Sequence, residues 1–142
     1  MAFCRIDGRA IRVREPVMEP DAVLIQDATL LHAVDLFQGL RSDGYVVINT
    51  GRELDALGLA ELVARLPAGR VRTVPATEFA VAHLGRPLPN AGLLGAFAAL
   101  TNVVELASIE KALRARFAPG LAEANAAVAR DAHARMREGS RC

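Results

Sequence analysis

The sequence predicts an α/β fold in which a parallel sheet lies between helices on both faces, giving three layers. In the first half of the chain, short apolar runs recur between turn residues, as in strands that are covered on both sides. A stretch with helical spacing of apolar residues follows each run. Strands that alternate with helices in this way form parallel sheets joined by right-handed crossovers.

The first expected element is an N-terminal β-hairpin. Residues 2–7 and 10–14 alternate apolar with polar side chains, and they flank the dipeptide Asp7-Gly8. Asp-Gly between two such runs is a strong hairpin signal, because both residues tolerate the backbone of a tight turn. Cys4 is accordingly expected to be a buried strand residue.

Two strand-and-helix units follow the hairpin. Residues 22–25 and 45–48 are continuous apolar runs, and each is expected to be a buried strand. Apolar residues at mixed helical spacing predict a helix between residues 30 and 37, with Gly39 as its C-cap. A second helix is expected over residues 54–66, where Pro and Gly then stop it.

A third unit and a helical final third complete the chain. Residues 71–74 predict a short strand, and residues 77–84 predict a helix that ends before Gly85. From residue 91 onward the pattern is helical only. Three helices are expected there, over residues 91–100, 106–117 and 121–136, with Pro119-Gly120 between the last two.

Length and composition fit one folded domain over residues 1–142. The chain is 52% hydrophobic and 23% charged, near the average for globular proteins. No apolar run approaches the roughly 18 residues that span a bilayer, and the N-terminus lacks the apolar region of a signal peptide. We therefore expect a cytoplasmic protein with no membrane contact.

Charge and cysteine content limit the possible partners. The 17 basic and 16 acidic side chains nearly cancel, and no stripe of Lys and Arg alternates with aromatic residues, so nucleic acid is not an expected partner. Cys4 and Cys142 lie at opposite ends of the chain and cannot supply the four thiolates of an iron–sulfur cluster. If clusters take part in the function, another chain carries them.

Polar side chains follow all three predicted strands. Asp27 follows the first strand, Asn49 and Thr50 the second, and Thr77 and Glu78 the third. Because the carboxyl ends of parallel strands meet at one edge, these side chains are expected to form a cleft for a polar ligand or a partner's loop. The alternative is local: Thr77 would cap a helix, and the carboxylate of Glu78 would interact favourably with the positive end of that helix's dipole. Asp27 or Asn49 would then only cap or form a turn.

The sequence contains no complete catalytic set. His32, His83 and His133 have no second ligand at metal-binding spacing. No nucleophile elbow, zinc-protease motif or phosphate loop is present. Gly92 and Gly95 lie within a helical run, where close helix packing explains them better than phosphate binding.

Several short motifs carry a family resemblance through their order and spacing. They are Pro20-Asp21 through Asn49-Thr50, Val74-Pro75-Ala76-Thr77-Glu78, Ala80, Leu84-Gly85-Arg86-Pro87, Pro89-Asn90, Leu94-Gly95-Ala96-Phe97, Ser108-Ile109-Glu110-Lys111-Ala112 and Glu123-Ala124-Asn125. Over nearly its whole length, the chain resembles the gamma domain of the pyruvate and related 2-oxoacid:ferredoxin oxidoreductases. Asn90, in one of these motifs, joins the candidate cleft residues.

The resemblance implies a function within a complex. Members of this family oxidise a 2-oxoacid with coenzyme A to an acyl-CoA and carbon dioxide, and pass electrons through iron–sulfur clusters to ferredoxin. Thiamine diphosphate belongs to their alpha and beta parts, and the clusters mostly to a ferredoxin-like part. By this resemblance the chain is a Rossmann-like, non-catalytic gamma subunit that binds no cofactor alone and has alpha, beta and ferredoxin-like subunits as partners.

One part of the family pattern has no counterpart in this sequence. Family gamma domains normally begin with a strand, a glycine-rich turn of the GxGGxG kind and a helix, ahead of the hairpin at which this chain starts. The resemblance thus implies an N-terminally shortened domain, whose turn comes from a separate polypeptide or from an upstream segment. Without that strand, a sheet edge along residues 23–25 or 46–48 is expected to be open to another chain.

Two other interpretations remain open from the sequence. The chain can be a free-standing α/β domain that binds a small polar ligand at the strand ends, or a remnant without activity. Neighbouring genes for a thiamine-diphosphate-binding chain and a ferredoxin-like chain would favour the gamma subunit over the free-standing domain, and their absence would favour the free-standing domain.

Overall fold

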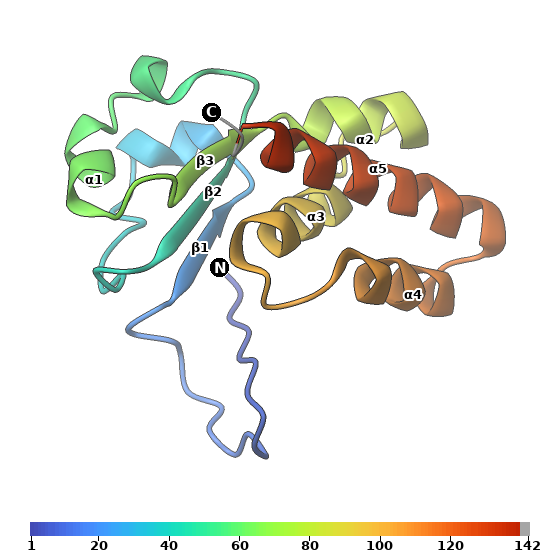
Figure 1. Cartoon of the computed structure of the whole chain (residues 1–142), viewed down its shortest axis with the longest axis horizontal. Helices are drawn as coiled ribbons and strands as arrows, with labels where there is room; N and C mark the ends of the chain where they lie inside the picture. Colours follow the sequence, from blue (N-terminus) through green and yellow to red (C-terminus); the bar gives the residue numbers. More distant parts are fainter. Residues whose placement is uncertain (140–142) are drawn as a thin grey trace.

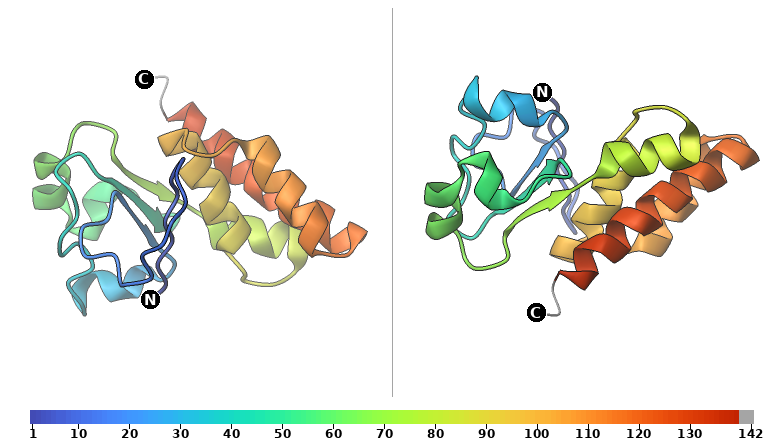
Figure 2. Two further views of the ribbon diagram at one scale, coloured as in Figure 1. Left: turned by 90° about the horizontal axis from the view of Figure 1, so that it is seen from below. Right: turned by 90° about the horizontal axis from the view of Figure 1, so that it is seen from above.

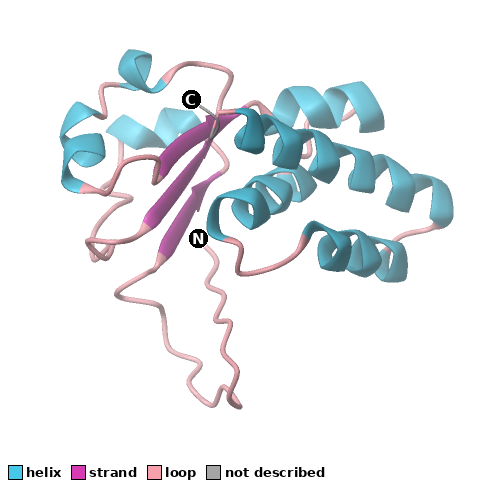
Figure 3. Cartoon of the chain, viewed as in Figure 1, coloured by secondary structure: helices cyan, strands magenta, loops and turns pink. Residues whose placement is uncertain are grey.

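The computed structural model describes residues 1–139 and contains an open sheet of three parallel strands (Figures 1 and 3). The strands are β1 (Ala22–Ile25), β2 (Tyr45–Asn49) and β3 (Val71–Val74), in the order β1–β2–β3. All three predicted strands and their parallel arrangement are confirmed. Helices lie on both faces of the sheet, so the predicted three layers are also present (Figure 2).

β2 is the central strand, and its apolar side chains are almost completely buried. Val46, Val47 and Ile48 are each at most 1% exposed. β-Branched residues suit such a strand, because they pack well on a pleated surface that is covered on both faces. β2 pairs with a neighbour on each side, so the open edge considered along residues 46–48 is wrong, and β1 and β3 form the edges instead.

Short helices cover the first face of the sheet. They are η1 (Ala28–His32), η2 (Leu54–Leu57) and α1 (Ala60–Arg65). Leu57 and Leu62 from these helices pack with strand residues in one hydrophobic cluster. Burial of these leucines, rather than helix propensity, holds such short helices in place.

Four longer helices form the other layer and confirm the predicted helix after β3 and the helical final third. They are α2 (Ala76–Leu84), α3 (Asn90–Thr101), α4 (Leu106–Arg116) and α5 (Pro119–Glu138). α5 contacts the other three helices and β3. Within residues 1–139, no helix is both long enough and apolar enough to cross a membrane.

The close contact between α3 and α5 depends on glycine. A Cβ added at Gly95 would lie 2.1 Å from the backbone oxygen of Ala129. A Cβ added at Gly92 would lie 2.8 Å from the Cβ of Ala76 in α2 and 3.3 Å from Cγ1 of Val128 in α5. All three distances are shorter than van der Waals contact, so the interpretation of these glycines as packing residues is confirmed.

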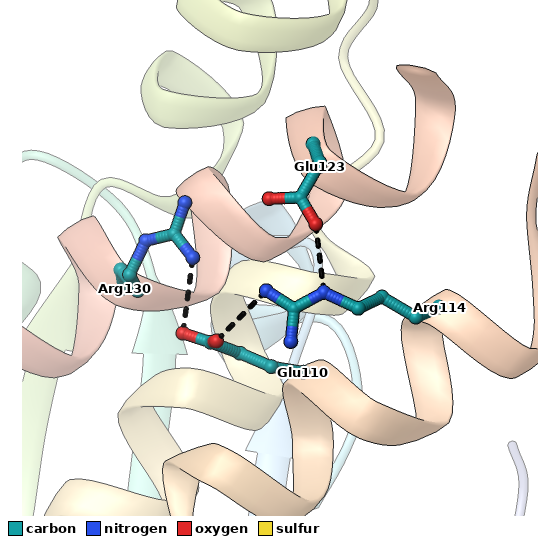
Figure 4. Close-up of polar contacts among 4 residues, drawn as sticks. All are labelled: Glu110, Arg114, Glu123 and Arg130. Atoms are coloured by element: carbon teal, nitrogen blue, oxygen red, sulfur yellow. Dashed lines mark hydrogen bonds and ion pairs between the residues drawn. The ribbon is translucent and has the colours of Figure 1, made fainter. Parts of the chain in front are cut away.

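Charged side chains join α4 to α5 (Figure 4). Glu110 accepts hydrogen bonds from Nη2 of Arg114 at 3.3 Å and from Nη1 of Arg130 at 3.1 Å. Nε of Arg114 also donates to Glu123 at 2.7 Å. This hydrogen bond, together with the positive charge of Arg114, lowers the pKa of Glu123 below its ordinary value.

Two predicted helices differ from the structure. The helix expected between residues 30 and 37 is replaced by the short 3₁₀ helix η1, which ends at His32 and is followed by turns. The apolar residues of this segment do not form one continuous helical face. The helix expected over residues 54–66 is divided at Gly58, which ends η2 with a φ of 70°. Glycine adopts this left-handed backbone without strain, so the chain turns before α1 begins.

The predicted hairpin is wrong in its strands. Residues 1–19, called the N-terminal arm below, turn back at Asp7-Gly8 but form no strand ladder (Figures 1 and 3). The arm supplies no residue to the hydrophobic clusters, and an isolated pair of strands is only marginally stable in water. Cys4, expected to be buried, is therefore exposed. Cys142 lies outside the described residues.

Candidate functional site

Side chains from all three strand ends meet at one edge of the sheet, and Asn49 joins them. Its Nδ2 donates to the backbone oxygen of Gln26, after β1, at 2.9 Å and to Oγ1 of Thr77, after β3, at 2.7 Å. Its Oδ1 accepts from the backbone N–H of Thr77 at 3.1 Å, which satisfies a donor that the first turn of α2 leaves free. Thr77 is the second residue of α2, so it does not cap that helix.

Gln26 extends these contacts to the start of α3. Its Nε2 donates to Oδ1 of Asn90, the first residue of α3, at 2.6 Å. The structure thus places Asn90, a candidate taken from the family resemblance, beside the strand ends. Sequence reasoning missed Gln26, and the available signal was its position directly after the apolar run of residues 22–25.

Asp27 is the N-cap of η1. Its Oδ1 accepts from Oγ1 of Thr29 at 2.6 Å and from the backbone N–H of Thr29 at 2.9 Å. Both hydrogen bonds stabilise the carboxylate and lower the pKa of Asp27 below its ordinary value, and the bond from the Thr29 hydroxyl has the larger effect. The local alternative therefore describes Asp27, which does not bond to Asn49 in the described structure.

Thr50 and Glu78 lie beside these contacts. Oγ1 of Thr50 accepts from the backbone N–H of Arg52 at 3.2 Å and so shapes the turn after β2. Glu78 lies in the first turn of α2, where the helix dipole favours a carboxylate. Its Oε1 lies 2.7 Å from where a Cβ on Gly51 would be. In the part of the chain that the structure describes, the Glu78 carboxylate has no hydrogen bond or ion pair.

Five residues make up what we call the strand-end edge: Gln26, Asn49, Thr77, Glu78 and Asn90. The edge can bind polar groups, because the Glu78 carboxylate is exposed and has no partner among residues 1–139. Among residues 1–139, no three His, Cys, Asp or Glu side chains come close enough to hold a metal ion. His83 instead bonds Asp131 at 2.6 Å, between α2 and α5.

A hollow of about 420 Å³ lies beside β3. Charged residues of both signs line it, namely Glu53, Asp55, Arg72, Arg135 and Glu138. None of the candidate residues contributes to this hollow. The strand-end edge is therefore a polar surface and not part of this cavity.

Comparison with known proteins gives consistent matches. Residues 1–135 match the family model for pyruvate ferredoxin/flavodoxin oxidoreductase. The chain is 40% identical over 136 residues to pyruvate synthase subunit PorC of Methanocaldococcus jannaschii, with 96% of this chain and 71% of the relative covered. It is 39% identical over 132 residues to the pyruvate/ketoisovalerate oxidoreductases common subunit gamma of Pyrococcus furiosus, with 93% and 70% covered.

A solved structure has the same fold. The crystal structure of pyruvate oxidoreductase subunit PORC from Thermotoga maritima matches with a TM-score of 0.69 at 30% sequence identity. The match covers 83% of this chain and 64% of the solved chain, which is slightly less than two thirds of the latter. The similarity therefore extends to the three-dimensional arrangement as well as the sequence.

Proposed function

Because the chain belongs to the pyruvate ferredoxin/flavodoxin oxidoreductase family, we propose that it is the non-catalytic gamma subunit of a 2-oxoacid:ferredoxin oxidoreductase. The complex oxidatively decarboxylates a 2-oxoacid with coenzyme A, forms an acyl-CoA and carbon dioxide, and reduces ferredoxin. In this proposal, residues 1–142 are a single gamma-type domain that assembles with alpha, beta and ferredoxin-like subunits in the cytoplasm.

The observation that carries this proposal is the extent of the family match. It includes residues 1–135, and relatives that are 36–42% identical are named as PorC or common gamma subunits of pyruvate or pyruvate/ketoisovalerate enzymes. The similarity is not limited to a short motif that unrelated proteins could share. It supports a role as a subunit, because the relatives themselves are named as subunits.

The cofactors of the proposed reaction belong to other subunits. An iron–sulfur cluster does not fit this chain, which has two cysteines, Cys4 and Cys142, where a cluster needs four thiolates. We assign the clusters to the ferredoxin-like subunit. Thiamine diphosphate, which supplies the electron sink for decarboxylation, is assigned to the alpha and beta subunits.

The strand-end edge is proposed to contact either coenzyme A or a loop of a neighbouring subunit. Asn49 and Thr77 hold the edge in shape, while Glu78 presents a carboxylate that no described residue pairs with. A carboxylate attracts N–H donors and repels phosphate groups. We therefore expect Glu78 to meet amide groups of a partner or of the ligand, while Asp27 and Thr50 act locally as cap and turn.

Co-expression with the thiamine-diphosphate-binding and ferredoxin-like chains encoded nearest to this one tests the proposal. We expect the chains to copurify in a fixed ratio and to reduce ferredoxin when both a 2-oxoacid and coenzyme A are present. Omitting this chain should lower the rate by at least about tenfold, equivalent to roughly 1.4 kcal/mol of barrier, and adding it back should restore the rate.

Full turnover without this chain, or failure to copurify, would contradict the proposal. Stabilisation of the isolated chain by one small polar metabolite, measured as a rise in melting temperature, would then favour the free-standing ligand-binding domain. The ferredoxin-reduction assay of the assembled complex uses pyruvate, 2-oxoglutarate and a branched-chain 2-oxoacid as substrates.

A further inference from the structure

We infer that the N-terminal arm is a docking element that lays its apolar side chains on a different polypeptide, at an apolar strip bordered by carboxylates. This inference rests on the proposed function, in which the chain is one subunit of a complex. It adds the segment that makes the contact and the chemistry of the surface that receives it.

The arm exposes a group of large apolar side chains. Phe3 is 49% exposed, Ile6 58%, Ile11 47% and Val13 53%. Phe3, Ile11 and Val13 line one hollow of about 330 Å³ in the arm. A soluble chain rarely leaves such a group open to water unless another surface covers it.

Contacts within the arm give it a defined bend. The side chain of Arg5 donates to the backbone oxygens of Glu15, at 2.6 Å, and Pro16, at 3.4 Å. The backbone N–H of Arg9 donates to Oδ1 of Asp7 at 3.1 Å, which holds the turn. The arm therefore projects from the sheet and helices as a doubled-back segment (Figure 1).

The backbone of the arm is available for pairing. Residues 11–14 alternate apolar with polar side chains as a strand does, but no backbone N–H of residues 2–14 donates to a backbone oxygen in the described structure. An extended segment with free donors and acceptors can add to a strand of another chain. Such pairing would order the arm and bury its apolar side chains together.

Charge identifies the kind of surface that fits. The first 14 residues contain four arginines and one aspartate. The guanidinium groups of Arg9, Arg12 and Arg14 have no hydrogen bond or ion pair with any residue from 1 to 139. Carboxylates beside an apolar strip would pair with them, and Arg is the cation best suited to such bidentate contacts.

Pairing of this arm with the arm of a second copy is disfavoured. Two arms that met across a symmetry axis would bring their arginines together and repel each other. Single-stranded nucleic acid also fits poorly, because Phe3 is the one aromatic residue in the arm and the net charge of the chain is only +1. Of these three surfaces, a different protein chain with an apolar strip bordered by carboxylates is the one that satisfies both the apolar and the charged groups of the arm.

Affinity measurements between the full chain and its copurified partner subunits test the inference. Val13→Glu places a charge on the apolar side of the arm, and Arg12→Glu reverses one free charge. We expect each to weaken binding by at least about tenfold, as substitutions at the centre of an interface do. Val103→Glu is the matched control, because Val103 is 54% exposed and lies outside the arm, between α3 and α4.

The arm substitutions should leave the fold intact, because the arm supplies no residue to the hydrophobic clusters. Hydrogen exchange provides the second measurement. Amides of residues 2–14 should exchange rapidly in the free chain and slowly in the complex. Binding of Val13→Glu and Arg12→Glu with wild-type affinity, or rapid exchange in the complex, would overturn the inference while the proposed function stands.

Other outcomes separate the two proposals. If the wild-type chain does not bind the partner subunits at all, the proposed function fails, and the docking role of the arm fails with it. If the wild-type chain forms dimers in sedimentation that Val13→Glu abolishes, or if the arm binds single-stranded RNA, the partner of the arm is not a different protein chain.

Discussion

Two side chains of the strand-end edge, Asn49 and Glu78, look equivalent in the sequence but differ in the structure. Each is a polar residue near the end of a predicted strand, so the pattern predicts the same cleft for both. Asn49 uses its amide hydrogens and oxygen within the chain, whereas the Glu78 carboxylate is unpaired in the described part. The difference depends on where the segment after β3 returns to the sheet, which no local pattern specifies.

Replacing Asn49 with alanine should lower the free energy of unfolding by about 1–3 kcal/mol, because groups of Gln26 and Thr77 lose their partner. Glu78→Ala removes only a favourable charge at a helix N-terminus, so we expect a loss of less than about 1 kcal/mol. Urea unfolding measures both changes. Equal losses in the two variants would show that the Asn49 bonds do not hold the edge together.

Gly95 is a second position where one residue decides the packing. Gly95→Ala should destabilise the fold by about 1–3 kcal/mol, because the added Cβ collides with the backbone of Ala129 and must push α3 away from α5. The control is Gly120→Ala in the first turn of α5, where the added Cβ meets no atom of residues 1–139 within 4 Å apart from its chain neighbours and the adjacent backbone of α5 itself. There we expect a gain of up to about 1 kcal/mol, since alanine restricts the unfolded chain. Similar urea midpoints for the two variants would disprove close packing at Gly95.

At the scale of elements, the sequence predicts a helix or strand correctly where its pattern of apolar side chains matches the burial of that element in the folded chain. The runs at residues 22–25 and 45–48 are apolar because strands lie there between two layers, and β3 buries a valine at each of its ends. The final helices have clear apolar faces. The division at Gly58 was not predicted, because apolar spacing continues across it. The arm has the alternation of a strand without a surface to pack on, so its pattern predicts a ladder that the isolated chain lacks.

The α4–α5 contact should be sensitive to acid. The pKa of Glu123 is lowered from its ordinary value of 4.5, first by the hydrogen bond from Arg114 and then by its charge. The unfolded chain therefore binds the proton more readily, so the stabilisation is complete above about pH 4.5 and disappears as the pH falls through the lower folded pKa. Melting temperatures from about pH 6 to about pH 3 should decline less in Glu123→Gln than in the wild type. Parallel curves would show that this carboxylate contributes nothing.

At the scale of the whole molecule, β2 links the hydrophobic clusters on the two sheet faces. Val46 and Ile48 pack in the cluster with the short helices, and Val47 packs with Leu93 and Met136 from the long ones. Neither face can open without exposing β2. We therefore expect the layers to unfold together in one cooperative transition.

Met136→Ala tests this connection between the layers. Met136 is 2% exposed, so its truncation should leave a cavity and lower the free energy of unfolding by about 2–5 kcal/mol. Met18→Ala is the matched control, because Met18 is 76% exposed and should change stability by less than about 0.5 kcal/mol. Urea unfolding followed by circular dichroism measures both. A Met136→Ala variant that melts its helices before its sheet would show that the layers are independent.

The position of α5 in the chain affects how the protein is made. α5 packs on α2, α3, α4 and β3, yet it follows all of them in sequence. During synthesis these elements leave the ribosome before the helix that covers them, so buried residues such as Ala98 and Leu113 stay open to water until α5 emerges. Domains generally fold as units during synthesis, and open apolar surface attracts chaperones and proteases. A ribosome that stalls just after Phe117 would therefore release a product that the cell degrades, whereas completion of the last helix commits the chain to its native core.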